Sequence, residues 1–442
     1  MKKVLIFLAG VIFLVSFWIV IHYVFPRNGY ILPFFIVLFI FDGYLWSSVK
    51  NRIFSFDPVI KFLLIILYWL PLISIILSFF AGIFSSFIDW NIPFRTYLTG
   101  MILVAYLSKF FPAFFLLIAD FIRLFEFGLL SVINGLSMSF SIISRKSGLL
   151  RAGWIVGTLV FVIMVAGIVG GNYHFRVREV SIHLQKLPDS FNGLRIVQVS
   201  DIHLGSWSCK SELQRAVNIV NSLKPDVIFF TGDLLNFCTK DVDSFKPILS
   251  QMQAPYGVFA ILGNHDYGDY ITWPSSEDKK KDGDDLVQYY KDLGWQLLLN
   301  EHRMLIRGKD SIVILGLENW GSAQRFQKRA SLEVAMRGVS KIPVKLLLSH
   351  DPSYWHRIIS RFHPEIDVTF SGHTHGFQLG IECFGIQWSP SKYFYEEWAG
   401  LYKTARPGNS PQYIYVNRGL GSIGYPGRIG IWPEITLITL KK

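Results

Sequence analysis

The chain has 442 residues, of which 51% are hydrophobic and 16% aromatic, and its net charge is +11. Much of that charge belongs to residues 1–171, where twelve Lys or Arg accompany five Asp or Glu, so residues 172–442 carry only +4. A surplus this small and dispersed argues against nucleic acid as a partner.

Residues 1–171 are predicted to form a multi-pass membrane region. A helix that crosses a bilayer needs about 20 apolar residues, and apolar runs occur at residues 4–24, 31–46, 59–80 and 152–170. Residues 97–143 are also apolar but contain Lys109, Arg123 and Glu126. We predict one crossing there and one amphipathic stretch at the membrane surface. About five transmembrane helices are therefore expected, with the bilayer as a partner.

The first apolar run has a second interpretation, a cleaved signal peptide. Its apolar stretch is longer than the usual core of such a peptide, and no small-residue cleavage pattern lies near Pro26. We therefore predict a retained helix. The other apolar runs would hold the protein in the membrane in either case.

Basic residues predict the side of the membrane on which residues 172–442 lie, because Lys and Arg are enriched in cytoplasmic loops. With five helices and the N-terminus inside, the outer side receives only Arg27 and Arg95. The cytoplasmic side then receives Lys2, Lys3, Lys50, Arg52, Lys61, Arg123, Arg145, Lys146 and Arg151. This asymmetry predicts an extracytoplasmic domain, and one helix more or fewer would reverse it.

Residues 172–442 are predicted to form a second domain of alternating strands and helices. Apolar strands at residues 194–199 and 227–230 flank a helix at residues 211–223, which is the pattern of a βαβ unit with parallel strands. The polar residues 273–285 are expected to form an exposed loop.

Five short blocks in this domain carry side chains of the kinds that bind metal ions. Each block directly follows an apolar run of strand type, and strands that end together deliver their loops to one edge of a sheet. In chain order the blocks read Asp201-Ile202-His203, Gly232-Asp233, Gly263-Asn264-His265-Asp266, Ser349-His350 and Gly372-His373-Thr374-His375. Carboxylate, imidazole and amide donors gathered in this way suit a pair of divalent cations of intermediate hardness.

The blocks and their order resemble the calcineurin-like metallophosphoesterase family, whose pattern is D-x-H, G-D, G-N-H-[DE], a single His and G-H-x-H. The flanking Leu187-Pro188 and Asn417-Arg418-Gly419-Leu420-Gly421 are similar to its YkuE/YaeI-like branch, which is often membrane-attached. One departure is Phe377, where that branch usually has glycine. The resemblance implies transmembrane α-helices followed by an α/β metallophosphoesterase sandwich of two mixed β-sheets flanked by helices.

The resemblance also implies which residues hold two divalent metal ions, which would be manganese, iron or zinc. The ligands of the first and second ion would be, respectively, Asp201, His203 and His375, and Asn264, His350 and His373. Asp233 would bridge the ions, since one carboxylate can span cations about 3.5–4 Å apart. Such a pair makes hydroxide available near neutral pH as the attacking nucleophile.

Two further residues of the third block are implied to serve the substrate. His265 would face it and protonate the leaving oxygen or steady the charge on phosphorus. Asp266 would orient the imidazole of His265. The chain is accordingly predicted to be a metal-dependent hydrolase of phosphate esters.

Three functions remain open at this point. The leading one is a membrane-anchored phosphoesterase that acts by metal-activated hydroxide on a phosphate ester in or near the bilayer, such as a lipid or lipid-linked substrate. The second is a UDP-2,3-diacylglucosamine-type pyrophosphatase, whose substrate is made in the cytoplasm and which needs the opposite topology. The third is a non-catalytic membrane receptor whose domain only binds a ligand, although no ligand position is lost.

Three features outside the blocks allow two interpretations each. The aromatic-rich residues 377–402 either pack over the sheet or form a rim that touches lipid headgroups. The glycine-rich residues 418–428 either present N–H groups and Arg to a phosphate or form turns that need positive φ. Cys209, Cys238 and Cys383 allow one disulfide or are simply buried thiols.

Overall fold

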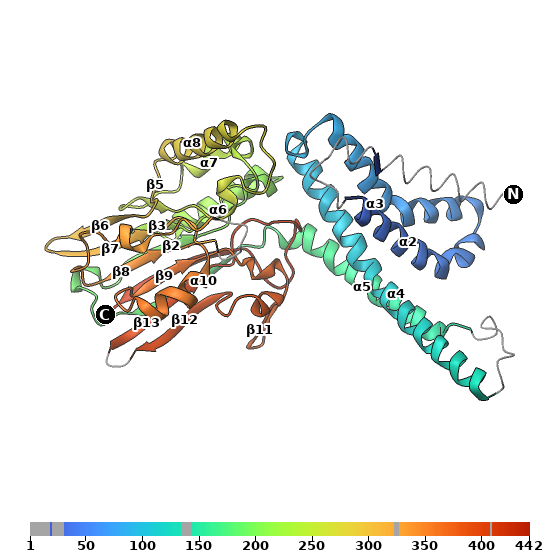
Figure 1. Cartoon of the computed structure of the whole chain (residues 1–442). Helices are drawn as coiled ribbons and strands as arrows, with labels where there is room; N and C mark the ends of the chain where they lie inside the picture. Colours follow the sequence, from blue (N-terminus) through green and yellow to red (C-terminus); the bar gives the residue numbers. More distant parts are fainter. Residues whose placement is uncertain (1–17, 20–30, 134–143, 322–326, 407–408) are drawn as a thin grey trace. The chain divides into compact units, whose positions relative to one another are not determined.

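The computed structural model of the chain describes residues 18–19, 31–133, 144–321, 327–406 and 409–442. The chain divides into two compact units, each described here by itself (Figure 1). The helical unit comprises Met1–Trp90 and Leu98–Val165. The sandwich unit comprises Asn91–Tyr97 and Ala166–Lys442.

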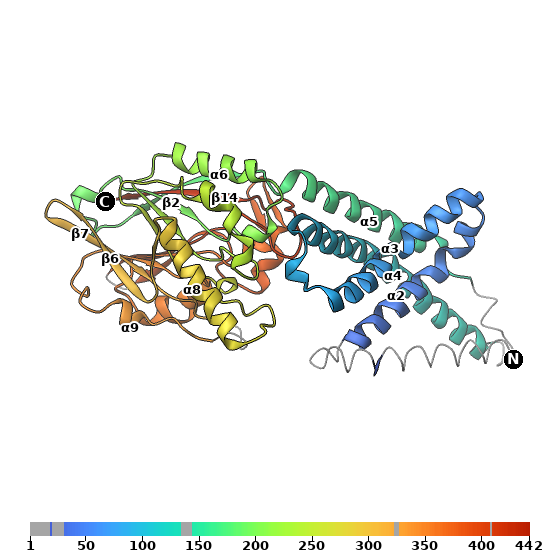
Figure 2. The ribbon, with the colours of Figure 1, turned by 90° about the horizontal axis from the view of Figure 1, so that it is seen from above.

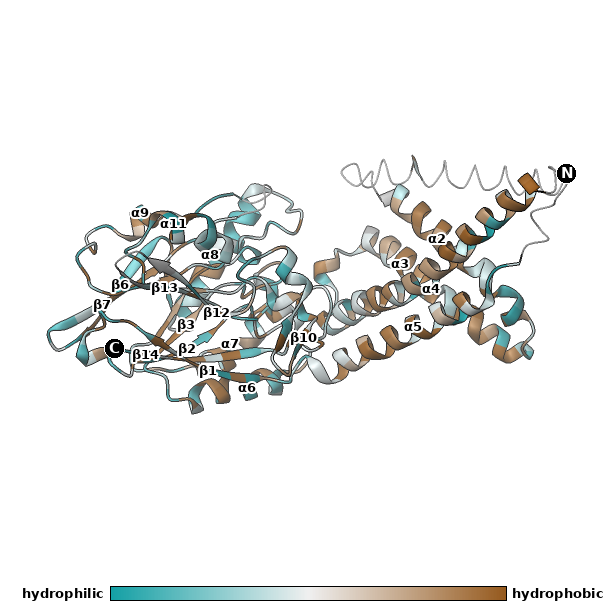
Figure 3. Ribbon diagram, turned by 90° about the horizontal axis from the view of Figure 1, so that it is seen from below, coloured by the Kyte–Doolittle hydropathy of each residue, from teal (hydrophilic) through white to brown (hydrophobic). Residues whose placement is uncertain are grey.

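Four long apolar helices are described in the first part of the chain, and Figure 3 shows them largely in the colour of hydrophobic residues. They are α2 (Ile31–Phe54), α3 (Pro58–Phe84), α4 (Ile92–Ile133) and α5 (Ser147–Ala166). All four are long and apolar enough to cross a membrane. The predicted helix at residues 4–24 lies, apart from Trp18 and Ile19, outside the described residues.

The prediction of two separate elements within residues 97–143 is wrong for the part that the structure describes. Helix α4 runs through 42 residues without a break, with Pro112 inside it. At 1.5 Å per residue it is about 63 Å long, roughly twice the thickness of a hydrocarbon core. The charge of Lys109 is tolerated within this apolar helix because its ammonium group lies 2.7 Å from the buried carboxylate of Asp42 on α2.

Helices α4 and α5 pack closely through two glycines. A Cβ atom at Gly157 would lie 2.6 Å from the carbonyl oxygen of Ser108, and one at Gly153 would lie 2.9 Å from the Cα of Pro112. Small residues four apart are typical of helix pairs in membranes, where close backbone approach provides the packing energy.

Two six-stranded mixed sheets form the sandwich unit, which matches the predicted fold class. The first has the order β1-β14-β2-β3-β4-β5 and the second β12-β13-β9-β8-β7-β6. The strands of the first sheet are β1 (Arg176–His183), β2 (Arg195–Val199), β3 (Val227–Phe230), β4 (Val258–Ala260), β5 (Gln296–Leu297) and β14 (Glu434–Lys441). Those of the second are β6 (Glu301–Arg307), β7 (Asp310–Gly316), β8 (Lys345–Leu348), β9 (Val368–Ser371), β12 (Gly400–Arg406) and β13 (Asn409–Val416).

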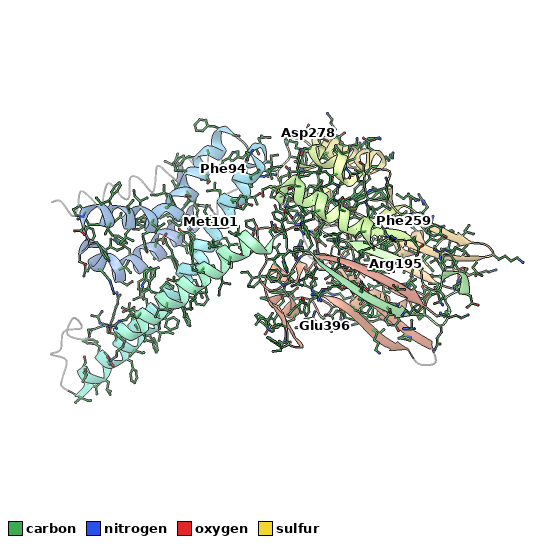
Figure 4. The ribbon with its side chains drawn as sticks, turned by 180° about the vertical axis from the view of Figure 1, so that it is seen from behind. Phe94, Met101, Arg195, Phe259, Asp278 and Glu396 are labelled. Atoms are coloured by element: carbon green, nitrogen blue, oxygen red, sulfur yellow. The ribbon has the colours of Figure 1, made fainter. Side chains whose placement is uncertain are left out.

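The core between the sheets is apolar. Phe229 and Phe259 from the first sheet are buried together with Leu346 and Phe370 from the second. The rings of Phe229 and Phe370 meet edge-to-face at a centroid distance of 5.0 Å. Figure 4 labels Phe259 among the strands, while the exposed Glu396 lies at the surface of the unit.

Helices cover the outer faces of both sheets. The first sheet is covered by α6 (Lys210–Ser222) and α8 (Ser276–Asp292), as Figure 2 shows, with the short α7 (Lys246–Leu249) beside them. Short helices accompany the second sheet, namely α9 (Leu332–Ala335), α10 (Pro352–Tyr354) and α11 (Ser360–Phe362). Strand β2, helix α6 and strand β3 form the predicted βαβ unit, with parallel strands.

The predicted exposed loop at residues 273–285 is wrong, because most of it is the first half of α8. The Ser275 hydroxyl caps this helix by accepting the backbone N–H of Asp278 at 3.0 Å. Asp282 is buried on the inner face of the helix, where it accepts the backbone N–H of Thr239 at 2.9 Å.

Candidate metal centre

All five blocks lie at the ends of central parallel strands. The blocks of Asp201, Asp233 and Asn264 follow β2, β3 and β4, and those of His350 and His373 follow β8 and β9. Parallel strands release their loops at the same edge of a sheet, so the two sheets bring the five blocks together (Figure 1).

One group of donors consists of Asp201, His203 and His375, all buried. The Nε2 atoms of His203 and His375 lie 3.0 Å apart, and Nε2 of His375 lies 3.2 Å from Oδ1 of Asp201. Two imidazole nitrogens this close are typical of ligands that share one cation. Bonds of about 2.0–2.2 Å to a cation place neighbouring donors roughly 3.0–3.6 Å apart.

A second group consists of Asp233, His350, His373 and Asn264. Nε2 of His350 lies 3.2 Å from Oδ2 of Asp233, 3.1 Å from Oδ1 of Asn264 and 3.2 Å from Nδ1 of His373. Oδ2 of Asp233 also lies 3.6 Å from Nε2 of His203 in the first group. The Asp233 carboxylate therefore stands between the two groups.

Backbone carbonyl groups fix the tautomers of these imidazoles. Nδ1 of His203 lies 2.9 Å from the carbonyl oxygen of Leu235, and Nδ1 of His350 lies 2.8 Å from that of Thr231. An N–H donated to a carbonyl leaves the Nε2 lone pair for a cation. His373 is turned the other way, with its Nε2 at 2.9 Å from the Tyr395 hydroxyl and its Nδ1 toward the cluster.

The backbone at the donors is held in an uncommon conformation. Five of the ten non-glycine residues with positive φ in the described chain are predicted ligands, namely Asp201, His203, Asp233, His373 and His375. Left-handed backbone is costly for such residues and gathers where function requires it. The glycines of the blocks allow the tight approach, since a Cβ at Gly263 would lie 2.1 Å from Oδ1 of Asp233.

The electrostatics of the cluster favour bound cations. Burial lowers the pKa of His203 to about 3, although the Asp233 carboxylate opposes the shift. Burial also lowers the pKa of His350, but the carboxylates of Asp233 and Asp201 outweigh it and raise that pKa to about 10. The cluster thus concentrates negative charge that divalent cations would neutralise, with release of protons.

His265 lies beside the first donor group, but the group that orients it differs from the prediction. Its ring is 4.9 Å from that of His203 and stacks on Tyr270 at a centroid distance of 3.9 Å. Its Nδ1 is 2.8 Å from the carbonyl oxygen of Asn236. The prediction that Asp266 orients this imidazole is wrong, because both Asp266 oxygens accept backbone N–H groups instead.

Four residues of the site were not identified from the sequence. Asn236 acts through its carbonyl group, which leaves no side-chain signature. Tyr270 and Tyr395 contact His265 and His373, and only Tyr395 belonged to a segment that the sequence singled out. Nη2 of Arg428, a residue of the segment 418–428 that the sequence also singled out, lies 3.3 Å from Nδ1 of His375.

The glycine-rich residues 418–428 form turns rather than a free phosphate loop. Arg418 is buried and ion-paired with Glu382 and Glu434. Arg428 is buried and donates to the carbonyl oxygens of Gly419 and Gly421. Gly419 has a φ of +77°, as the turn interpretation requires. Cys209, Cys238 and Cys383 are all free thiols.

Comparison with known proteins identifies the family. The calcineurin-like phosphoesterase profile matches residues 194–377, and the profile of a probable calcineurin-like phosphoesterase transmembrane domain matches residues 26–172. The metallophosphoesterase YkuE of Bacillus subtilis is 30% identical over 272 residues, which cover 60% of this chain and 84% of that protein. The chain belongs to the calcineurin-like metallophosphoesterase family.

Two further proteins are similar to this chain. A transmembrane protein with a metallophosphoesterase domain from Danio rerio is 31% identical over 304 residues, covering 67% of this chain but only 64% of that protein. A protein named UDP-2,3-diacylglucosamine pyrophosphatase LpxG from Chlamydia trachomatis is 29% identical over 296 residues, covering 56% and 83% respectively. The phosphoesterase match indicates a hydrolase of the kind that uses divalent metal ions. The transmembrane-domain match and the four long apolar helices indicate a membrane protein.

Proposed function

We propose that the chain is a membrane-anchored phosphoesterase whose centre holds two divalent cations with Asp233 between them. Their ligands would be Asp201, His203 and His375 for one, and Asn264, His350 and His373 for the other. The observation that carries this proposal is the position of Oδ2 of Asp233, 3.6 Å from Nε2 of His203 and 3.2 Å from Nε2 of His350. Mixed imidazole, amide and carboxylate donors suit manganese, iron or zinc.

When bound, such a pair of cations supplies Lewis acidity and a hydroxide near neutral pH. The chain's own residues supply the proton for the leaving oxygen. Nδ1 of His265 donates to the Asn236 carbonyl, and its Nε2 has no hydrogen-bond partner among the residues that the structure describes. Stacking on Tyr270 holds the ring in one plane. His265 can therefore hold a proton at Nε2 and deliver it to the leaving oxygen.

The proposed substrate is a phosphate ester on a lipid or a lipid-linked headgroup. The apolar span Ser147–Gly171 is followed by β1 after residues 172–175 only. Four extended residues reach about 13–14 Å, so the domain stays near the bilayer. Relatives named as pyrophosphatases of UDP-2,3-diacylglucosamine in two Chlamydia species add support for a lipid-linked class.

We further propose that the sandwich unit lies outside the cytoplasm. If α2 to α5 are consecutive crossings, the α2–α3 and α4–α5 connections share one side and the domain lies on the other, whatever precedes Ile31. The connection side carries Lys50, Arg52, Lys61, Arg123, Arg145, Lys146 and Arg151, against Arg27 and Arg95 on the domain side. Because Lys and Arg are enriched in cytoplasmic loops, this distribution favours connections in the cytoplasm. The nucleotide-lipid pyrophosphatase is the second candidate, and it needs the opposite orientation.

The deciding experiment compares Asp233→Asn and His265→Ala with the wild type, using hydrolysis of an activated aryl phosphate ester and elemental analysis of bound metal. Turnover should require Mn²⁺, Fe or Zn²⁺. We expect Asp233→Asn to lose bound metal and all turnover. We expect His265→Ala to keep its metal but to lose roughly 10²–10⁴-fold in kcat, the contribution of a general acid.

The control for this comparison is His363→Ala, since His363 is a histidine of the same unit that pairs with Glu365 away from the blocks. It should behave as the wild type. Metal loss in His265→Ala with full retention in Asp233→Asn would show that the roles are assigned wrongly. Normal metal content without hydrolysis of any phosphate ester would favour the receptor alternative.

A further inference from the structure

Large exposed apolar side chains gather in one segment of the sandwich unit. Isolated ones such as Ile306 and Phe362 are ordinary on protein surfaces. A group of six, each between 48% and 100% exposed, forms what we call the aromatic hairpin patch: Phe377, Ile381, Phe384, Ile386, Tyr393 and Phe394. A contiguous exposed apolar group marks an interaction site.

The hairpin of β10 (Ile381–Cys383) and β11 (Ile386–Trp388) is amphipathic. Ile381 pairs with Trp388 and Cys383 with Ile386, so these four side chains share one face. The other face carries Glu382, which accepts Nε of Arg418 at 2.9 Å and also pairs with Arg178. The polar face therefore anchors the hairpin to the sandwich, and the apolar face is exposed.

The tip of the hairpin is unusual. Phe384 and Gly385 form a two-residue connection with φ of 50° and 79°. Such turns favour Asn, Asp or Gly because both positions are left-handed. Phe384 is instead a bulky side chain in strained backbone, and it is 100% exposed, so it contributes nothing to the core. This combination points to a contact outside the sandwich unit.

The start of the hairpin is tied to the end of a membrane span. The backbone N–H of Arg428 donates to the carbonyl oxygen of Gly167, which belongs to the span Ser147–Gly171, at 3.2 Å. The neighbouring Ile429 accepts the N–H of Gly380 at 2.9 Å, one residue before β10. Two hydrogen bonds thus connect the span's last turns to the hairpin, all within the sandwich unit.

The patch also reaches the donor cluster. Phe377 lies two residues after His375, and its ring stacks on that of Phe394 at a centroid distance of 5.8 Å and an interplanar angle of 9°. The next residue, Tyr395, places its hydroxyl 2.9 Å from Nε2 of His373. Phe377 and Phe394 of the patch therefore adjoin the predicted ligands His373 and His375 along the chain.

We propose that the aromatic hairpin patch inserts into the interfacial layer of the bilayer in which the chain is anchored, and presents lipid headgroups to the metal centre. Aromatic side chains are enriched at this layer, and shallow burial of apolar side chains holds proteins there. The link to the substrate rests on the proposed function, whereas the contact with lipid does not.

The test measures how close the patch lies to lipid. Cys383 is exposed beside the tip, while Cys238 is buried and burial raises the pKa of its thiol to about 11, so Cys383 can be labelled selectively in a Cys209→Ser variant. The full chain is reconstituted in phosphatidylcholine vesicles with an environment-sensitive fluorophore at Cys383. We expect strong quenching by phospholipids that carry a nitroxide near the headgroup.

The matched control carries the fluorophore at Ile306→Cys in a Cys209→Ser/Cys383→Ser background. Ile306 is 63% exposed and lies near the end of another hairpin, β6–β7. Positions 306 and 383 are therefore both exposed hairpin positions, and they differ in their place on the sandwich unit. Quenching at position 383 well above that at position 306 supports the proposal. Equal quenching at both, or shielding of Cys383 by a second copy of the chain without quenching, overturns it.

A second measurement tests the role in substrate access. Phe384→Ser should lower turnover of a lipid phosphate in vesicles by roughly tenfold relative to a soluble aryl phosphate, the effect of losing burial of one Phe side chain. Ile306→Ser should leave that ratio unchanged. An unchanged ratio in Phe384→Ser would overturn the link between patch and substrate. Failure of the chain to hydrolyse any ester would instead contradict the proposed function, and the quenching would still decide the lipid contact.

Discussion

The carboxylate of Asp266 accepts four backbone N–H groups and so joins two of the blocks. Oδ2 accepts those of Asp233 and Gly263 at 2.8 and 2.9 Å. Oδ1 accepts those of Leu234 and Leu235 at 2.9 and 3.0 Å. The side chain is buried, so these hydrogen bonds are shielded from water. Asp266 therefore shapes the loop that carries Asp233.

We predict that Asp266→Asn destabilises the fold and weakens metal binding. The amide nitrogen would replace one acceptor and face two N–H donors, which should cost about 2–4 kcal/mol at a buried site. Thermal unfolding and metal titration measure these losses. Asp292→Asn, which removes a surface ion pair with Lys246, is the control and should cost less than about 1 kcal/mol.

The pH dependence of turnover separates this role from the one inferred from the sequence. If Asp266 acts only on the loop, the residual activity of Asp266→Asn should keep the pH profile of the wild type. A shifted profile in a variant of normal stability would mean that Asp266 tunes His265 after all. The family resemblance implies that Asp266 orients its neighbour His265, but adjacency in sequence does not decide where the two side chains point.

The buried pair of Asp42 and Lys109 connects helices α2 and α4 in the interior of the helical unit. Asp42 is fully buried on α2, and Lys109 on α4 is 11% exposed at its side chain. The Tyr106 hydroxyl also donates to Asp42, at 2.8 Å. Charged residues in a membrane are costly unless paired, and here each has its counter-ion. This pairing could not be predicted from the sequence, since the two residues belong to helices whose packing no motif reveals.

We predict that removing either charge alone destabilises the helices more than removing both. Asp42→Asn or Lys109→Met would leave a buried, unpaired charge at a cost of about 3–5 kcal/mol. The double variant should cost less than either single variant, and unfolding in detergent micelles would measure the difference as a coupling energy. Glu126→Gln, in the more exposed pair with Lys146, is the control. Additive losses would mean that the pair is not coupled.

Helix α8 shows where local sequence reasoning failed in the sandwich unit. Its first half is rich in Lys and Asp, a composition that predicts a solvated loop. Lys and Glu also favour helices, however, and Ser275 caps this one. By contrast, the strands before the blocks were correctly predicted. Continuous apolar runs at parallel central strands are an unambiguous pattern, whereas a polar helix and a polar loop have similar compositions.

At the scale of the whole chain, the testable feature is the orientation in the membrane. We predict that a cysteine added after Lys442, in a Cys209→Ser/Cys383→Ser background, reacts with a membrane-impermeant maleimide on intact cells. Ser55→Cys, in the connection between α2 and α3, should react only after lysis. The basic residues beside that connection are the physical reason. The reverse labelling would favour the nucleotide-lipid pyrophosphatase.

The membrane part was predictable in kind but not in detail. Hydropathy alone located the apolar runs at residues 31–46, 59–80 and 152–170, and helices occur at each of them. It could not show that residues 97–133 lie within one helix, because charged residues such as Lys109 and Glu126, which are paired in the structure, look the same in sequence as an interruption. The family profile over residues 26–172 supports a membrane domain in this part of the chain.

Each donor group draws on both sheets, so the proposed cations would stabilise the fold as well as take part in the reaction. Asp201 and His203 follow strand β2 of the first sheet, while His375 follows β9 of the second and lies 172 positions after His203 in the chain. A cation held by all three would close that long loop as a cross-link does, and metal binding in such sites is coupled to folding. We predict that a chelator lowers the thermal unfolding temperature and speeds amide hydrogen exchange in β8 and β9 first. Unchanged hydrogen exchange in the chelated protein would mean that the sheets hold together without the ions. If exchange does speed up, the supply of metal ions determines the lifetime of the folded enzyme.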